Sequence, residues 1–132
     1  MKYLSARHIL FLHSLVLEKD GGMHGVRDYH ALLNLENLPR QSVFGKELYP
    51  TIFEKAAVLA RGIIMNHPFI DGNKRTGMTA ASVFLENNKY YFMIKEGEIE
   101  KFALKIIKDR LSIEDIAGWF RKNSKQSQKS HA

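Results

Sequence analysis

The sequence has no cysteine and no long hydrophobic run. Without cysteine among its 132 residues, the chain can form neither a disulfide framework nor a thiol nucleophile. No uninterrupted apolar stretch approaches the roughly 20 residues that a membrane-crossing helix needs. The first eight residues lack the pattern of a secretory signal. We therefore expect a cytoplasmic protein without a membrane partner.

Two further patterns are missing. None of the six histidines forms the His-x-x-x-His pair of a helical zinc site, which argues against a metal hydrolase. The net charge of +6 does not mark a broad basic surface, because Arg121, Lys122, Lys125 and Lys129 supply four of these charges and leave +2 for residues 1–120. This placement argues against a nucleic-acid function. The polar residues 123–132 show no apolar periodicity, so we expect a disordered basic tail after a single domain of residues 1–122.

Apolar periodicity and capping residues predict a mainly helical chain. Ser5, Thr51 and Ser112 stand at cap positions, and each of the last two has an acidic residue three positions later. Pro68 ends the third helix because proline disfavours helical geometry in the preceding residue. The expected helices cover about 5–19, 28–37, 51–67, 73–87, 98–108 and 112–122, with a small hairpin within 39–49 and an extended segment at 89–95.

One segment carries most of the chemistry, and it links the two helices whose sequences look most buried: His67-Pro68-Phe69-Ile70-Asp71-Gly72-Asn73-Lys74-Arg75. Gly72 lets the backbone approach a ligand closely, and the helix that starts at Asn73 presents free amides to phosphate oxygens. Lys74 and Arg75 add cations beside them. Asp71 is an oxygen ligand of the kind that holds Mg²⁺ against nucleotide phosphates.

His67 lies just before this phosphate site and can take a proton from an attacking hydroxyl. Taken singly, these features have ordinary explanations: a histidine at a helix end is usually structural, and Asp-Gly-Asn is a common turn. A purely structural loop does not need all these residue types in this order. Phe69 and Ile70 are interpreted as apolar anchors that bury the loop.

These nine residues resemble the signature of the Fic/Doc superfamily, His-x-Phe-x-(Asp/Glu)-Gly-Asn-x-Arg. Lys74 is similar to the Doc ("death on curing") branch, because the Fic branch has glycine there. Further segments resemble Doc proteins in the same order: Gly25-Val26-Arg27-Asp28, Phe44-Gly45, Glu47-Leu48-Tyr49-Pro50 and Lys55-Ala56-Ala57. The resemblance covers roughly residues 4–120.

The resemblance implies an all-α Fic/Doc fold, a compact bundle of about six helices with a short hairpin-like flap. It also implies roles by position. His67 would be the general base, Asp71 the Mg²⁺ ligand, and Phe69 an anchor in the core. The phosphate cradle would be Gly72, Asn73, Lys74 and Arg75. The flap, which would align the target by strand addition, would be Val43, Phe44, Gly45, Lys46 and Glu47.

Two departures from the Fic pattern indicate which group is transferred. Lys74 would fill part of the anion hole that seats the inner phosphates in Fic enzymes, and Met78 replaces a second arginine. Doc proteins resemble kinases, passing the terminal phosphoryl group of ATP or another nucleoside triphosphate to a threonine of elongation factor Tu and inhibiting translation. The hypothesis is therefore a Doc-like toxin kinase with Mg²⁺ and an antitoxin segment that folds on the C-terminal helices. Fic-type AMP transfer and a non-catalytic binding module remain as alternatives.

Overall fold

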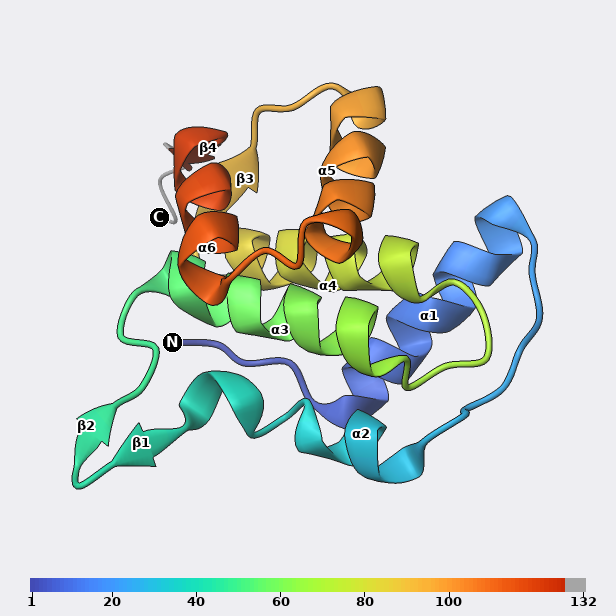
Figure 1. Ribbon diagram of the computed structural model, residues 1–132, viewed down its shortest axis with the longest axis horizontal. Coiled ribbons are helices and arrows are strands. Elements are labelled where there is room, and N and C mark those ends of the chain that lie inside the picture. The colour runs from blue at the N-terminus through green and yellow to red at the C-terminus, as the bar shows by residue number, and fades with distance from the viewer. Residues whose placement is uncertain (128–132) are drawn as a thin grey trace, which may run out of the picture.

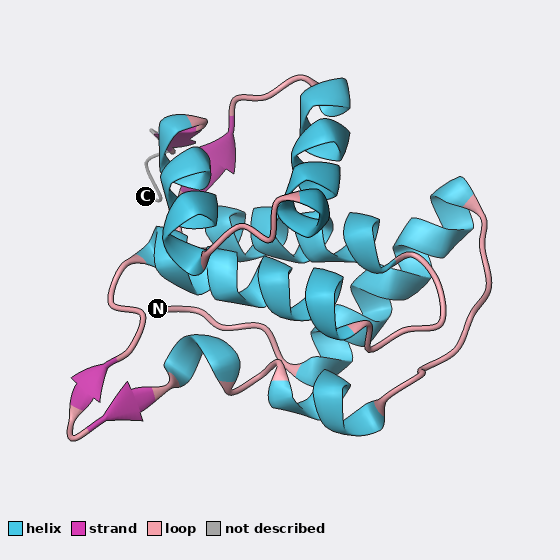
Figure 2. Ribbon diagram, in the orientation of Figure 1, coloured by secondary structure: helices cyan, strands magenta, loops and turns pink. Residues whose placement is uncertain are grey.

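The structure is a computed structural model and describes residues 1–127. Within that range it contains six α-helices, one short 3-10 helix and two small antiparallel sheets, which confirms the predicted all-α fold (Figures 1 and 2). The helices are α1 (Ala6–Asp20), α2 (Tyr29–Asn34), η1 (Leu38–Arg40), α3 (Ile52–Asn66), α4 (Asn73–Asn87), α5 (Glu96–Lys108) and α6 (Ile113–Lys122). The strands are β1 (Ser42–Val43), β2 (Lys46–Glu47), β3 (Tyr90–Phe92) and β4 (Ser124–Gln126).

Helices α3 and α4 form the centre of the molecule and lie side by side (Figure 1). Gly77 on α4 makes this close approach possible, because a Cβ there would lie 2.7 Å from Cγ1 of Ile64 and 3.0 Å from the carbonyl oxygen of Ala60. Most residues of α3 are buried, as its nearly all-round apolar sequence predicts. The loop that joins the two helices is therefore held by the most rigid part of the fold.

The other helices cover this central pair. α1 packs on α4, and α5 and α6 lie together on one side of the pair (Figure 1). The rings of Phe102 on α5 and Trp119 on α6 stack with centroids 3.8 Å apart. α2 and η1 pack near α3, and α2 ends at Asn34, three residues before the end of the helix that we expected over 28–37. Pro39 lies inside η1 and lacks the N–H that a continuous helix would need.

Each small sheet has two strands. The predicted hairpin is present, with β1 paired to β2. β3 pairs with β4, with Tyr91 opposite Lys125. The prediction of a disordered tail from residue 123 is therefore wrong for 124–126, because main-chain pairing needs no apolar periodicity in the side chains. The remainder of that tail, residues 128–132, lies outside the described residues. Over the described range, no helix combines the length and apolar content that a membrane span requires.

Candidate active site

The loop of residues 67–72 begins at the C-terminus of α3 and ends at the N-terminus of α4. Pro68 and Phe69 are buried, and His67 is exposed. His67 caps α3 in the left-handed conformation, with φ 48° and ψ 61°. Pro68 disfavours right-handed helical geometry at His67, so the helix ends here. A left-handed residue other than glycine costs about 1–2 kcal/mol, which the surrounding contacts must offset.

Phe69 anchors the loop as predicted. Its side chain is fully buried, and the His13 ring of α1 stacks on it with centroids 3.8 Å apart. Nε2 of His13 lies 2.8 Å from the carbonyl oxygen of Asp71. Burial lowers the pKa of His13, so the neutral ring donates an Nε2–H to that carbonyl. The anchor therefore also fixes the peptide that carries Asp71.

Ile70 is not the buried anchor that we expected. Its side chain is 51% exposed. It lies over Gly25, where an added Cβ would come within 2.5 Å of Cδ1 of Ile70. Gly25 also has φ 132°, which residues with a side chain rarely adopt. The missing side chain therefore allows both this backbone conformation and the close contact with Ile70.

Asp71 is exposed, and backbone amides orient both oxygens of its carboxylate. The Gly72 N–H donates to Oδ1 over 2.9 Å, and the Met23 N–H donates to Oδ2 over 3.0 Å. These two hydrogen bonds lower the pKa of Asp71 below its usual value. The bond from Met23 has the larger effect, and the bond from Gly72 the second largest. The group is therefore ionised at neutral pH and keeps free lone pairs on both oxygens.

A Mg²⁺ ion fits this arrangement only together with a phosphate ligand. Within residues 1–127 no group of three or more His, Cys, Asp or Glu side chains could hold a metal. Mg²⁺ is commonly bound by one or two carboxylates and by substrate phosphates, with water completing its shell. Asp71 supplies such a carboxylate beside the N-terminus of α4, where phosphates would lie.

The N-terminus of α4 has the features of an anion site. Gly72 is its N-cap, with φ 76° and no side chain to accept from the first amides of the helix. The amides of Asn73, Lys74 and Arg75 precede the first helical hydrogen bond, which Thr76 donates to Gly72. The side chains of Lys74 and Arg75 are exposed beside these amides. This end of the helix therefore combines free donors, a positive dipole end and two cations.

Asn73 contributes differently from what its place in the motif suggests. Its side chain is buried and closes a ring with Phe69: Oδ1 accepts from the Phe69 N–H over 3.0 Å, and Nδ2 donates to the Phe69 carbonyl over 2.9 Å. The oxygen and the nitrogen of the side-chain amide thus both form hydrogen bonds within the loop. The backbone N–H of Asn73 is left for a phosphate, together with the second N–H of its side-chain amide.

We expect Asn73→Ala to lower the free energy of unfolding by about 1–3 kcal/mol, because it leaves the buried N–H and carbonyl of Phe69 unpaired. Urea unfolding measures the change. Asn87→Ala, at the exposed end of the same helix, is the control and should shift stability by less than about 0.5 kcal/mol. Equal stability of Asn73→Ala and the wild-type protein would show that the ring with Phe69 contributes nothing.

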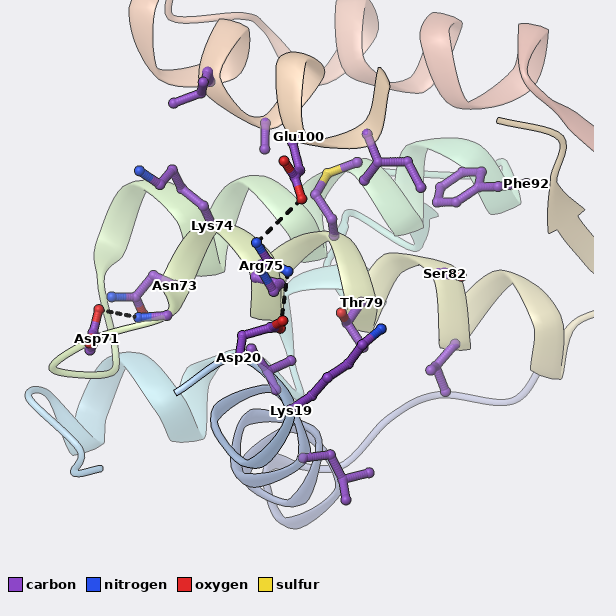
Figure 3. A pocket seen from close by; sticks show the side chains of 18 of the residues that line it. Lys19, Asp20, Asp71, Asn73, Lys74, Arg75, Thr79, Ser82, Phe92 and Glu100 are labelled. Carbon is purple, nitrogen blue, oxygen red and sulfur yellow. Dashed lines mark hydrogen bonds and ion pairs between the residues drawn. The ribbon is translucent and has the colours of Figure 1, made fainter. Parts of the chain in front are cut away.

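Arg75 is held by acids from two other helices. Nη1 lies 3.0 Å from Asp20 of α1, and Nη2 lies 3.3 Å from Glu100 of α5 (Figure 3). The Arg75 side chain is 43% exposed. Ion pairs of this exposure contribute about 1 kcal/mol or less. A phosphate can therefore displace the acids at low cost.

The comparisons with known proteins agree with this geometry. The family model described as "Fic/DOC family" matches residues 3–85. The chain belongs to the Fic/DOC family. It is also 38% identical, over 87 residues, to a protein named "Toxin Doc" from Mycolicibacterium smegmatis (strain ATCC 700084 / mc(2)155). The match covers 66% of this chain and 65% of that relative, so the chain spans just under two thirds of the relative's length.

The Fic/DOC motif and the hairpin lie at opposite ends of α3. The hairpin precedes the N-terminus of α3, and His67 follows its C-terminus (Figure 1). A helix of 15 residues is about 22 Å long. The structure therefore brings together the predicted residues of 67–75 but not those of 43–47. The expected alignment of a target by strand addition to the hairpin stays a prediction, and the target would have to extend along α3 to reach His67 as well.

The hairpin itself is exposed along its whole length. Phe44 at its turn is fully exposed and has φ 51°. Glu47 ties the hairpin to the core through Lys55, whose buried Nζ lies 2.8 Å from Glu47 Oε1 and 3.0 Å from the Pro39 carbonyl oxygen. A target segment that reached both the hairpin and His67 would need at least about six extended residues.

A groove of about 700 Å³ adjoins the motif. It lies between α1, α4 and α5, and its exposed surface is mainly apolar, with Leu15, Met78 and Leu104 among the apolar side chains that line it. Its polar end is formed by residues 71–75 of the motif (Figure 3). Met78, at the position where Fic proteins often carry a second arginine, is an uncharged and buried side chain.

Residues 21–28, which we call the strap, also hold the loop. Residues 25–28 resemble Doc proteins, but that resemblance predicted no contact with the loop. The Arg27 and Asp28 amides of the strap donate to the Pro68 carbonyl, and its Gly25 carbonyl accepts from the Ile70 N–H. The glycines of the strap are the sequence feature that indicates this contact. At Gly22, with φ 127°, a Cβ would lie 2.8 Å from Oδ2 of Asp71. Closely spaced glycines thus marked a close approach between two distant segments.

Proposed function

We propose that this chain is a Doc-like toxin of a toxin–antitoxin system that phosphorylates a hydroxyl group of a protein. One observation carries the proposal: the exposed His67, the ionised Asp71 and the open N-terminus of α4 stand on one short, rigid loop. Phosphoryl transfer requires mainly positioning and charge stabilisation, and this loop offers a base, a metal ligand and several donors.

The reaction would proceed by transfer of the terminal phosphoryl group of ATP. His67 takes the proton of the acceptor hydroxyl as its oxygen bonds to the γ-phosphorus, and the bond from that phosphorus to the β–γ bridging oxygen breaks. The amides of α4 with Lys74 and Arg75 hold the phosphates in line. Asp71 would hold Mg²⁺, which supplies neutralisation of the developing phosphate charge. The products are ADP and the phosphorylated protein.

The proposed target is a threonine of elongation factor Tu, with translation inhibited in the cytoplasm. The direct test incubates the chain with Mg-ATP and elongation factor Tu and weighs the target by mass spectrometry. The gain expected is that of one phosphoryl group. A nucleotidyl-sized gain would favour AMP transfer, and no gain on any protein of a lysate would favour a non-catalytic module.

The proposed antitoxin segment would lie in the groove rather than on α6. The surface of the groove is mainly apolar, and the groove shares residues 72–75 with the phosphate cradle, so a bound segment would exclude the nucleotide. An antitoxin segment that folds as it binds can present an apolar face of this kind. Of the two C-terminal helices, the groove uses only α5.

Lys74→Gly tests which group is transferred. Lys74 is exposed beside the α4 amides, so its loss removes one cation from the phosphates and opens space for their inner groups. We expect phosphorylation to fall by about 10-fold or more, with AMP-sized additions appearing in the mass spectrum. Lys95→Gly, outside the site at the N-cap of α5, should leave phosphorylation unchanged. Full phosphorylation by Lys74→Gly would contradict the role given to Lys74.

A further inference from the structure

His67 has a backbone conformation that its own sequence does not favour. Its φ of 48° lies in the left-handed region, and it terminates a 15-residue helix whose last carbonyls need donors. Glycine is the common residue at such a position. The geometry of this side chain therefore depends on contacts from elsewhere in the chain.

Arg27 makes those contacts. Its Nε donates to the carbonyl oxygen of His67 over 2.6 Å, and its Nη2 donates to the carbonyl oxygen of Asn66 over 2.7 Å. The two bonds grip both peptides that flank the turn at His67. The positive charge also faces the negative end of the α3 dipole, where a cation is favourable. One planar guanidinium thus fixes the direction in which the His67 side chain leaves the helix.

The strap on which Arg27 lies is itself fixed to the loop. The backbone amide of Arg27 donates to the Pro68 carbonyl over 2.8 Å, and Val26 forms a bridge with Phe69. Four residues earlier, the Met23 amide donates to the Asp71 carboxylate. A single eight-residue segment therefore holds the base and the metal ligand in one relative position.

We propose that Arg27 is a positioning residue that holds His67 in its reactive geometry by bonding the His67 and Asn66 carbonyls. The inference deepens the proposed function, in which His67 is the base, and rests on it. Loss of the guanidinium would let the turn relax toward commoner backbone angles and move the imidazole. A displacement of about 1 Å at a catalytic group can cost about 100-fold in rate.

Three variants test the proposal. Arg27→Met keeps the aliphatic stem and removes every donor, and Arg27→Lys keeps the charge without the planar fork. Arg7→Met is the matched control, because Arg7 is exposed on α1 and no hydrogen bond or ion pair to its side chain is found within residues 1–127. Transfer kinetics with Mg-ATP and the protein target are measured for each variant, together with the ¹⁵N-resolved backbone and ring signals of His67.

In Arg27→Met we expect kcat to fall by about 10- to 100-fold, with KM for Mg-ATP and the stoichiometry of nucleotide binding unchanged. Arg27→Lys should recover part of the rate, since its ammonium can reach one carbonyl. Arg7→Met should match the wild-type protein. The His67 signals should broaden or double in Arg27→Met alone. A merely structural role would instead lower nucleotide-binding stoichiometry and rate together.

Either of two results would overturn the proposal: a kcat for Arg27→Met within about twofold of wild type, or His67 signals that are the same in Arg27→Met and Arg7→Met. If the wild-type protein transfers nothing, the proposed function fails. The His67 signals then still decide whether Arg27 fixes this residue.

Discussion

His67→Ala is expected to reduce group transfer by about 100- to 10,000-fold, the range over which a positioned general base acts. The alanine variant cannot accept the proton of the attacking hydroxyl. Nucleotide affinity should stay within about twofold, because the phosphate donors lie on α4, beyond Gly72. Mass spectrometry of the target over time measures the rate, and calorimetric titration with Mg-ATP measures the affinity.

His30→Ala is the matched control for this experiment. His30 is an exposed histidine of α2, outside the motif of residues 67–75, so its removal should leave transfer unchanged. Expression toxicity provides a second readout, and it should disappear in His67→Ala alone. Transfer by His67→Ala at the wild-type rate would show that another group acts as the base.

Asp71→Asn is expected to lower the rate of Mg²⁺-dependent transfer by about 100-fold or more. The reason is that a metal ion lowers the free energy of the charged transition state by several kcal/mol. The amide has the shape of the carboxylate, and its oxygen can still accept from the Met23 or the Gly72 N–H. The loop should therefore keep its fold while it loses the charge that holds the ion. Rates measured across a range of Mg²⁺ concentrations should show that the variant needs far more metal.

Asp109→Asn, at the exposed C-terminus of α5, is the control and should behave like the wild-type protein. A second measurement uses the lowered pKa of Asp71 in the metal-free protein. A carboxyl with a lowered folded-state pKa adds stability above its unfolded pKa of about 3.9, and this contribution is lost as the pH falls through the folded value. The stability gap between wild type and Asp71→Asn should therefore close only in acid. Equal Mg²⁺ requirements in the two proteins would contradict metal binding by Asp71.

Sequence alone was sufficient where the determining interactions are local. The caps at Ser5, Thr51 and Ser112 were read correctly, since a cap bonds an amide three residues away. Pro68 and Gly72 define the ends of the loop through effects that are also local. Pro68 disfavours helical geometry in the residue before it, and Gly72 adopts a positive φ at the start of α4. The all-α fold and the motif segment therefore followed from short-range patterns.

The extent and partners of the site depended on contacts between distant segments. Arg27 reaches a carbonyl 40 positions along the chain, and His13 reaches one 58 positions along it. The strand at 124–126 was missed because main-chain pairing leaves no pattern in a polar sequence. The hairpin was found, but its separation from His67 by the full length of α3 became evident only from the packed helices.

The sequence by itself determined the helices, the loop at 67–72 and the chemical groups on it, because each depends on neighbours within a few residues. Only the tertiary structure decided the positions and orientations of these groups relative to one another. The strap and α1 approach the loop through backbone hydrogen bonds, a stacked ring and a guanidinium. Such contacts arise when distant segments pack together, and the local residue pattern does not specify them.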